Sequence, residues 1–70
     1  MANGIIIEVN GECRTTAPGT TVSGLLAQLL LNTGRVAIEC NRQILPREKW
    51  EETLVAEGDR FEIVQFVGGG

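Results

Sequence analysis

The chain has 70 residues, with nine acidic residues against six basic ones and a formal net charge of −3. A domain of this size buries only about 60% of the surface that its unfolded chain exposes, so we expect one thin core and no second domain. The basic residues are scattered singly, which argues against nucleic acid as a partner. Two cysteines do not make a secreted disulfide scaffold, and neither a signal peptide nor a long apolar run is visible. We therefore expect a soluble, cytoplasmic protein with no membrane partner.

The predicted elements begin with a β-hairpin. Residues 5–9 alternate so that the odd-numbered, apolar side chains share one face of a strand. Asn10-Gly11 follows, and this pair is the strongest short hairpin signal because both turn positions require positive φ. Residues 12–16 then return antiparallel, and Pro18-Gly19 ends the hairpin.

A single amphipathic helix follows the hairpin. Thr20 or Thr21 can cap its start by accepting a hydrogen bond from a free backbone N–H. The apolar residues recur at helical spacing and form one stripe, made of Val22, Leu25, Leu26, Leu29 and Leu30. Asn32-Thr33-Gly34 is typical of a helix end. The leucine-rich stripe predicts a core position for the helix and no cofactor role.

Two short strands are predicted after the helix. Residues 36–40 form the first strand, and Asn41-Arg42 reverses the chain into a short second one at residues 43–45. Residues 47–53 predict an irregular turn or a single helical turn. Within it, Trp50 is expected to cover the rim of the core rather than a ligand.

The last strand is predicted from Arg60 to Val67, a stretch rich in β-branched and aromatic residues. A β-turn at Glu57-Gly58-Asp59 leads into it, with positive φ at Gly58. The order of elements predicts an α+β fold, with one helix packed across one face of a mixed sheet of four to five strands. In the compact arrangement the first and last strands are parallel neighbours at the centre, which is the β-grasp, or ubiquitin-like, fold. We assign residues 1–67 to this domain and residues 68–70 to a flexible C-terminal tail.

The tail, Gly68-Gly69-Gly70, has no side chains. Three extended residues reach roughly 10 Å, and they can enter a channel that any larger side chain would block. The tip is the α-carboxylate of Gly70, which is ionised at neutral pH. Such a tail suits a terminal carboxylate that is itself a substrate, while a merely frayed end is the alternative interpretation.

Catalysis by the chain itself is not expected. It has no His and no Tyr, and no Ser or Cys lies in a recognisable nucleophile motif. Its carboxylates and thiols lack the spacing of metal ligands. General acid–base chemistry at neutral pH would then need a strongly shifted carboxylate or thiol. We expect no catalytic residue, no metal site and no cofactor bound by this chain.

Four groups of residues carry a resemblance to a known family. In chain order they are Val36-Ala37-Ile38-Glu39 with Asn41, Ile44-Leu45-Pro46-Arg47 with Trp50, Gly58-Asp59 with Glu62-Ile63-Val64, and Val67-Gly68-Gly69-Gly70. Their order and spacing resemble the ThiS-type sulfur carrier proteins of thiamine biosynthesis. These are β-grasp relatives of ubiquitin and of the small subunit of molybdopterin synthase.

The resemblance implies a chemistry for the tail. An adenylating enzyme of the ubiquitin-activating type, using ATP and magnesium of its own, would activate the carboxylate of Gly70. Sulfur from a persulfide donor would then give a thiocarboxylate, which passes its sulfur to thiazole synthase. By the same resemblance Gly68 and Gly69 thread the partner's channel and Phe66 and Val67 dock the base of the tail. The carrier alone is expected to be a monomer.

Two other functions use the same activated terminus. One is a ubiquitin-like modifier that ends as an amide on a lysine, and the other is a molybdopterin-type sulfur carrier. Residues 62–67 favour the thiazole branch because they lack the prolines that molybdopterin-type carriers usually place there. A non-covalent β-grasp interaction module is the third alternative, but it gives no reason for three terminal glycines.

The two cysteines depart from the family pattern. Cys40 stands where relatives often carry a charged residue, and Cys13 has no role in the pattern. We expect both to be small apolar side chains on the inner faces of strands. A redox role for either thiol is the alternative.

Overall fold

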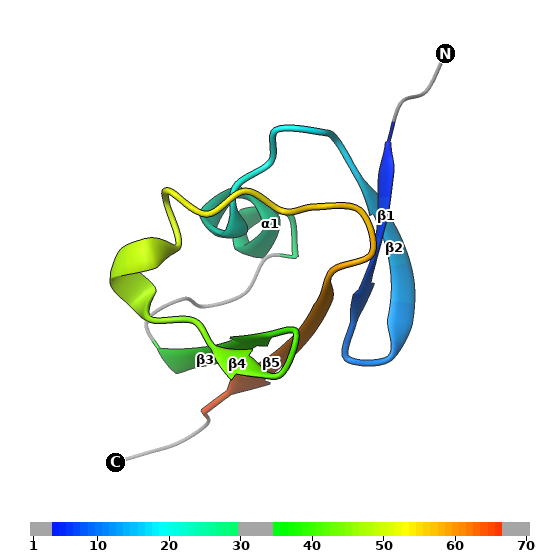
Figure 1. Ribbon diagram of the computed structural model, residues 1–70. Coiled ribbons are helices and arrows are strands. Elements are labelled where there is room, and N and C mark those ends of the chain that lie inside the picture. Colours follow the sequence, from blue (N-terminus) through cyan, green and yellow to red (C-terminus); the bar gives the residue numbers. More distant parts are fainter. Residues whose placement is uncertain (1–3, 30–34, 67–70) are drawn as a thin grey trace.

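The computed structural model describes residues 4–29 and 35–66. The elements are β1 (Ile5–Val9), β2 (Glu12–Thr16), α1 (Val22–Gln28), β3 (Val36–Cys40), β4 (Gln43–Ile44), the 3-10 turn η2 (Arg47–Lys49) and β5 (Arg60–Gln65). Figure 1 shows the two hairpins, β1–β2 and β3–β4, on either side of β5. The predicted α+β class is confirmed.

The sheet has the strand order β2-β1-β5-β3-β4 (Figure 1). β1 and β5 are parallel neighbours in its centre, and every other pairing is antiparallel. The predicted β-grasp arrangement is therefore confirmed. The parallel pairing is short, because it covers only Glu8 with Arg60 and Val9 with Phe61, whereas β3 and β5 pair over five residues each.

The core lies between α1 and one face of the sheet. Side chains alternate along each strand, so one face of the central strands can be fully apolar. The buried apolar side chains are Ile7, Val9, Val22, Leu25, Leu26, Ile38, Trp50, Val55, Phe61 and Ile63. Trp50 is buried more deeply than the expected rim position, with 5% of its surface exposed. Its indole N–H donates to the Leu45 carbonyl at 3.0 Å, which satisfies the one polar group of this side chain.

The helix begins after Thr21, whose hydroxyl accepts a hydrogen bond from the Gly24 N–H at 3.1 Å. Thr21 rather than Thr20 is therefore the N-cap. The helix ends at Gln28, and the predicted stop at Asn32-Thr33-Gly34 lies outside the described residues. No helix in the described ranges is long and apolar enough to cross a membrane.

Both predicted reversals are tight turns, and positive φ at both positions was predicted for Asn10-Gly11 but not for Asn41-Arg42. Asn10 and Gly11 have φ values of 50° and 85°, and Asn41 and Arg42 have φ values of 52° and 72°. Positive φ at both positions is the type I′ turn, whose twist matches that of the flanking strands. Gly58 has a φ of 84°, as the predicted turn before β5 requires.

The prediction for Cys13 is wrong, and the register of the β1–β2 pair explains why. Cys13 lies opposite Glu8, whereas Arg14 lies opposite the buried Ile7. Opposite residues of an antiparallel pair share a face, so Cys13 points away from α1 and is exposed. The side of this edge strand that faces α1 carries the charged residues Glu12 and Arg14. The sequence pattern had placed the less polar Cys13 on that side. Cys40, opposite Phe61, packs against the core as predicted.

Candidate functional site

The predicted reactive tail lies outside the described residues. This applies to Gly68, Gly69 and Gly70, and also to Val67, one of the two predicted docking residues. The structure does describe Phe66 and the strand that leads to it. The site is therefore built here from the end of β5 and from the surface around it.

The end of β5 is held by the sheet. The Phe66 N–H donates to the Arg35 carbonyl at 2.7 Å, which continues the β3–β5 pairing one step beyond the strand. β5 has a paired strand on each side near its start, so its position is set by the centre of the fold. The described chain thus reaches Phe66 on a strand that is hydrogen-bonded to its neighbours.

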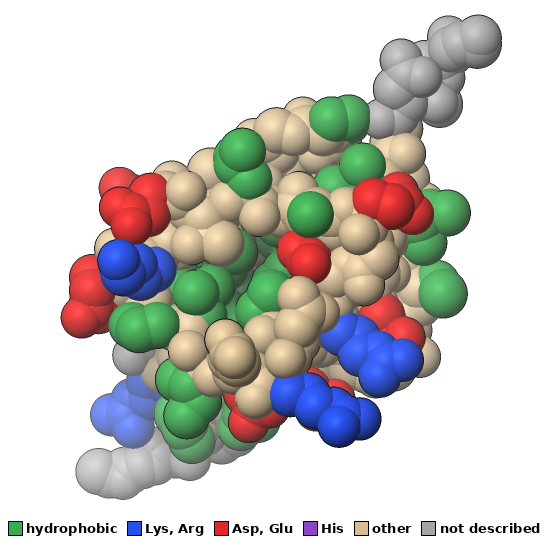
Figure 2. All heavy atoms as spheres, in the orientation of Figure 1, with side chains coloured by type: hydrophobic (Ala, Val, Ile, Leu, Met, Phe, Trp, Pro, Cys, Tyr) green, Lys and Arg blue, Asp and Glu red, His purple; other side chains and the backbone are tan. Residues whose placement is uncertain are grey.

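The face of the sheet away from α1 carries an apolar patch near the end of β5. Its members are Ala37, Ile44, Val64 and Phe66, and we call them the outer patch. Val64 lies opposite Ala37 in the β3–β5 register, and Ile44 lies opposite Glu39, which is the next residue of β3 on the same face. Ile44, Val64 and Phe66 are 77%, 53% and 56% exposed. Figure 2 shows exposed hydrophobic side chains at the corner of the molecule where β5 ends.

Two carboxylates border the outer patch. Glu39 and Glu62 lie directly opposite each other on β3 and β5, and Glu39 is also opposite Ile44. Like charges in this position repel, so the pair does not stabilise the sheet. Further along the same face, the Arg60 guanidinium lies 3.6 Å from the Glu8 carboxylate, and this ion pair occupies the opposite end of β5. The patch therefore offers an apolar centre and an acidic border, which fits a partner with apolar and basic groups.

The thiols show no arrangement for chemistry. Burial raises the pKa of the Cys40 thiol above its ordinary value, and the Asp59 carboxylate raises it further. Cys40 is therefore a poor nucleophile at neutral pH. Nowhere in residues 4–29 or 35–66 do three His, Cys, Asp or Glu side chains come close enough together to hold a metal ion. What this surface can do is present a strand end and bind another protein.

The outer patch was missed by sequence reasoning except for Phe66. A signal existed, because Val64 is an apolar residue at an outward position of β5, where the two preceding outward positions, Arg60 and Glu62, are charged. Its meaning depends on the register with β3, which brings Ala37 and Ile44 to the same place. That register is set by residues far apart in the chain.

Comparisons with known proteins give the family. The ThiS family matches residues 7–70. The sulfur carrier protein ThiS of Escherichia coli (strain K12) is 38% identical over 61 residues, which are 87% of this chain and 92% of that protein. The crystal structure of the thiamine biosynthesis protein ThiS from Geobacter metallireducens has a TM-score of 0.79 and 33% identity, covering 94% of this chain and 100% of the other.

A second kind of relative is much longer. The thiazole synthase of Paramagnetospirillum magneticum (strain ATCC 700264 / AMB-1) is 40% identical over 62 residues, which are 89% of this chain but 19% of that protein. The chain thus spans about a fifth of the length of the thiazole synthases that it matches. The small carrier of Escherichia coli, by contrast, matches over 92% of its own length. On the family match and the matched fold together, the chain belongs to the ThiS family.

Proposed function

We propose that this protein is a sulfur carrier for thiazole formation in thiamine biosynthesis, with Gly70 as the residue that carries the sulfur. The observation that carries the proposal is the extent of the family match, which runs to residue 70 and so includes the glycine tail. The match to a named sulfur carrier over 92% of its length supports the same role. The thiazole synthase relatives support thiazole synthase as the acceptor of the sulfur.

The chemistry proceeds through an activated terminus. A carboxylate oxygen of Gly70 attacks the α-phosphorus of ATP, pyrophosphate leaves, and an acyl-adenylate forms. The terminal sulfur of a persulfide then attacks the carbonyl carbon, and AMP leaves. A thiol reduces the remaining S–S bond, which releases the thiocarboxylate. ATP and magnesium belong to the adenylating enzyme, so the chain is a co-substrate rather than a catalyst.

The chain's own part is recognition and presentation. The outer patch docks on the adenylating enzyme, with Phe66 and Val67 at the base of the tail. Aromatic side chains, Phe among them, are enriched in protein interfaces, and Phe66 is a half-exposed aromatic side chain at the end of β5. The glycines then enter the partner's active site because they present backbone only.

The experiment is an intact-mass measurement. The protein is incubated with its cognate adenylating enzyme, ATP, magnesium and a persulfide donor, and is then given thiazole synthase with its substrates. We expect a mass gain equal to the exchange of one oxygen for sulfur, followed by its loss. Stable adducts on lysine as the main product would instead identify a protein modifier. Discharge by molybdopterin synthase but not by thiazole synthase would move the carrier to the other pathway.

A further inference from the structure

The backbone of β5 is supported on both sides at its start but on one side near its end. The backbone N–H and C=O groups of its even-numbered residues point toward β3, and this hydrogen bonding continues to the Phe66 N–H. The backbone groups of its odd-numbered residues point toward β1. There, the Asp59 carbonyl accepts from the Glu8 N–H at 2.9 Å, and the Phe61 carbonyl accepts from the Asn10 N–H at 2.8 Å. Since β1 ends at Val9, Ile63 lies beyond the reach of its backbone.

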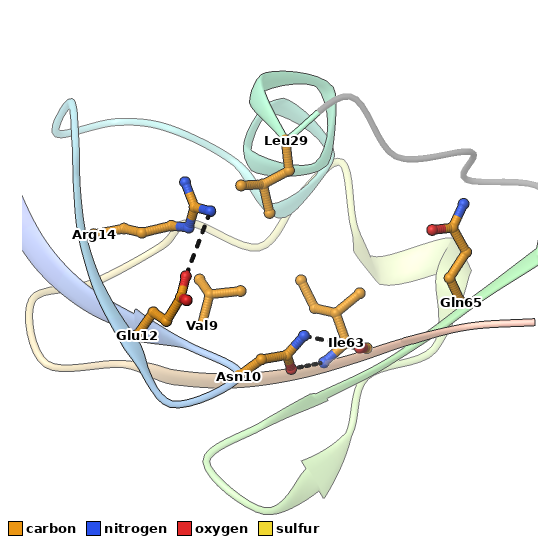
Figure 3. A pocket seen from close by; sticks show the side chains of 7 residues that line it. All are labelled: Val9, Asn10, Glu12, Arg14, Leu29, Ile63 and Gln65. Atoms are coloured by element: carbon orange, nitrogen blue, oxygen red, sulfur yellow. Dashed lines mark hydrogen bonds and ion pairs between the residues drawn. The ribbon is translucent and has the colours of Figure 1, made fainter.

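The side chain of Asn10 takes the place of the missing strand. Its Oδ1 accepts from the Ile63 N–H at 2.7 Å, and its Nδ2 donates to the Ile63 carbonyl at 3.1 Å (Figure 3). A carboxamide carries the same donor and acceptor as a peptide group, so it extends the β1–β5 ladder by one residue. In the part of the chain that the structure describes, no group bonds the backbone of Gln65 on this side. Among residues 4–29 and 35–66, Asn10 is thus the last hydrogen-bonding partner of β5 on this edge before the tail.

A cavity lies beside the contact between Asn10 and Ile63. Asn10 and Ile63 line a cavity of about 470 Å³ together with Val9 and Gln65, and its walls include the Glu12–Arg14 ion pair and Leu29 (Figure 3). The cavity adjoins the backbone of β5 up to Gln65, while the Ile63 side chain itself is packed in the core. On the β1 side, the two hydrogen bonds of Asn10 hold the backbone of Ile63.

A second asparagine holds the other end of β5 in the same way. Asn41 occupies the first position of the other type I′ turn, with a φ of 52° against 50° for Asn10. Its Oδ1 accepts from the Arg60 N–H at 3.0 Å, and its Nδ2 donates to the Asp59 carboxylate at 3.1 Å. The two residues match in type, turn and bond count, but only Asn10 acts near the tail.

We propose that Asn10 is a positioning residue for the C-terminal tail. By fixing Ile63, it sets the direction in which Phe66 and the glycines leave the sheet and reach the adenylating enzyme. The inference rests on the proposed function, because it concerns presentation of the Gly70 carboxylate. Without the Asn10 bonds, the end of β5 is held by β3 alone and can pivot, so fewer encounters place the tail correctly.

The test compares Asn10→Gly with Asn41→Gly. Glycine keeps positive φ without strain, so both turns can form while both carboxamides are lost. ATP–pyrophosphate exchange with the cognate adenylating enzyme gives kcat and KM for each variant as substrate. We expect kcat to fall about fivefold for Asn10→Gly, the scale of one net hydrogen bond, with a smaller change in KM. Asn41→Gly should keep the wild-type kcat.

Amide hydrogen exchange supplies a readout that general destabilisation would not produce. In Asn10→Gly the Ile63 amide should exchange faster, while the Glu62 and Val64 amides, which face β3, keep their protection. Asn10→Asp retains the acceptor but places a carboxylate oxygen against the Ile63 carbonyl. It should lower kcat at least as much, and it serves as the test variant if Asn10→Gly does not fold.

The outcomes separate this inference from the proposed function. A wild-type kcat for Asn10→Gly, or equal losses for both glycine variants, would overturn the role of Asn10 and leave the carrier function intact. Faster exchange of all β5 amides alike would also overturn it. Wild-type protein that supports no pyrophosphate exchange would overturn the proposed function itself.

Discussion

The two faces of the sheet come from the same strands, yet they do different work. On β5, Phe61 and Ile63 point toward α1 and are 2% and 9% exposed, whereas Val64 and Phe66 on the other face are 53% and 56% exposed. One step along a strand thus separates a core position from an exposed apolar one. The inner apolar residues account for the fold. The outer ones do not, and a contiguous exposed apolar patch is typical of a protein interface.

The largest effect should come from truncating matched phenylalanines on the two faces. Phe61→Ala leaves a cavity beneath α1 and should lower the free energy of unfolding by about 3–5 kcal/mol, most of the stability of so small a domain. Phe66→Ala should change it by less than about 0.5 kcal/mol. Urea denaturation followed by Trp50 fluorescence measures both. Similar losses for the two variants would mean that Phe66 belongs to the core.

The same Phe66→Ala variant should fail in docking. We expect KM in ATP–pyrophosphate exchange to rise about tenfold or more, the effect of losing an aromatic anchor from an interface. Ile6→Ala is the control. Ile6 is 53% exposed on the same face of the sheet, but it lies near the start of β1, beside the start of β5 and away from Phe66. An equal effect of both substitutions would contradict docking through the outer patch.

The cysteines give a third comparison of the two faces. Cys40→Ser places a hydroxyl against the core and should cost about 1–3 kcal/mol, whereas Cys13→Ser on the outer face should be nearly neutral. Because folding raises the pKa of Cys40, the unfolded thiol ionises first, and stability should fall as the pH rises above the ordinary thiol pKa. Cys40→Ser should remove this part of the pH dependence. Sulfur loading that is lost in a folded double Ser variant would show instead that a thiol takes part in the transfer.

The smallest effect concerns the acidic border of the outer patch. Glu62→Gln removes the repulsion with Glu39 and should raise the free energy of unfolding by up to about 0.5 kcal/mol. It should also weaken the salt dependence of KM, because one charge that attracts a basic partner is gone. Glu8→Gln, which breaks the ion pair with Arg60, should shift stability slightly in the opposite direction. An unchanged salt dependence for Glu62→Gln would show that this carboxylate takes no part in docking.

Much of the fold could be predicted from local signals. Asn10-Gly11 and Asn41-Arg42 fixed the two hairpins, and the leucine stripe fixed the helix face, because turn chemistry and periodicity act over a few residues. The face of β2 could not be predicted, since an edge strand with charges on both sides has no clear apolar alternation. Only the register with β1 decides that Cys13 points outward.

The chemistry proposed for the site comes from the sequence, whereas the surroundings of the tail could not be predicted from it. The glycines and Phe66 are recognisable from the end of the sequence alone. The contact of Asn10 with Ile63 joins residues 53 positions apart, and it arises because β1 ends before β5 does. No local pattern reports where one strand ends relative to another. Such contacts appear only when the strands are placed together.

The Gly70 carboxylate is the group that we propose reacts, and moving it is the most direct test. A variant that carries one additional alanine after Gly70 keeps both faces of the sheet and moves the carboxylate onto a residue with a side chain. We predict that wild-type protein supports ATP–pyrophosphate exchange and gains sulfur, while the extended variant unfolds at the same urea concentration and does neither. Wild-type rates of exchange with the extended variant would show that the Gly70 carboxylate is not the reacting group.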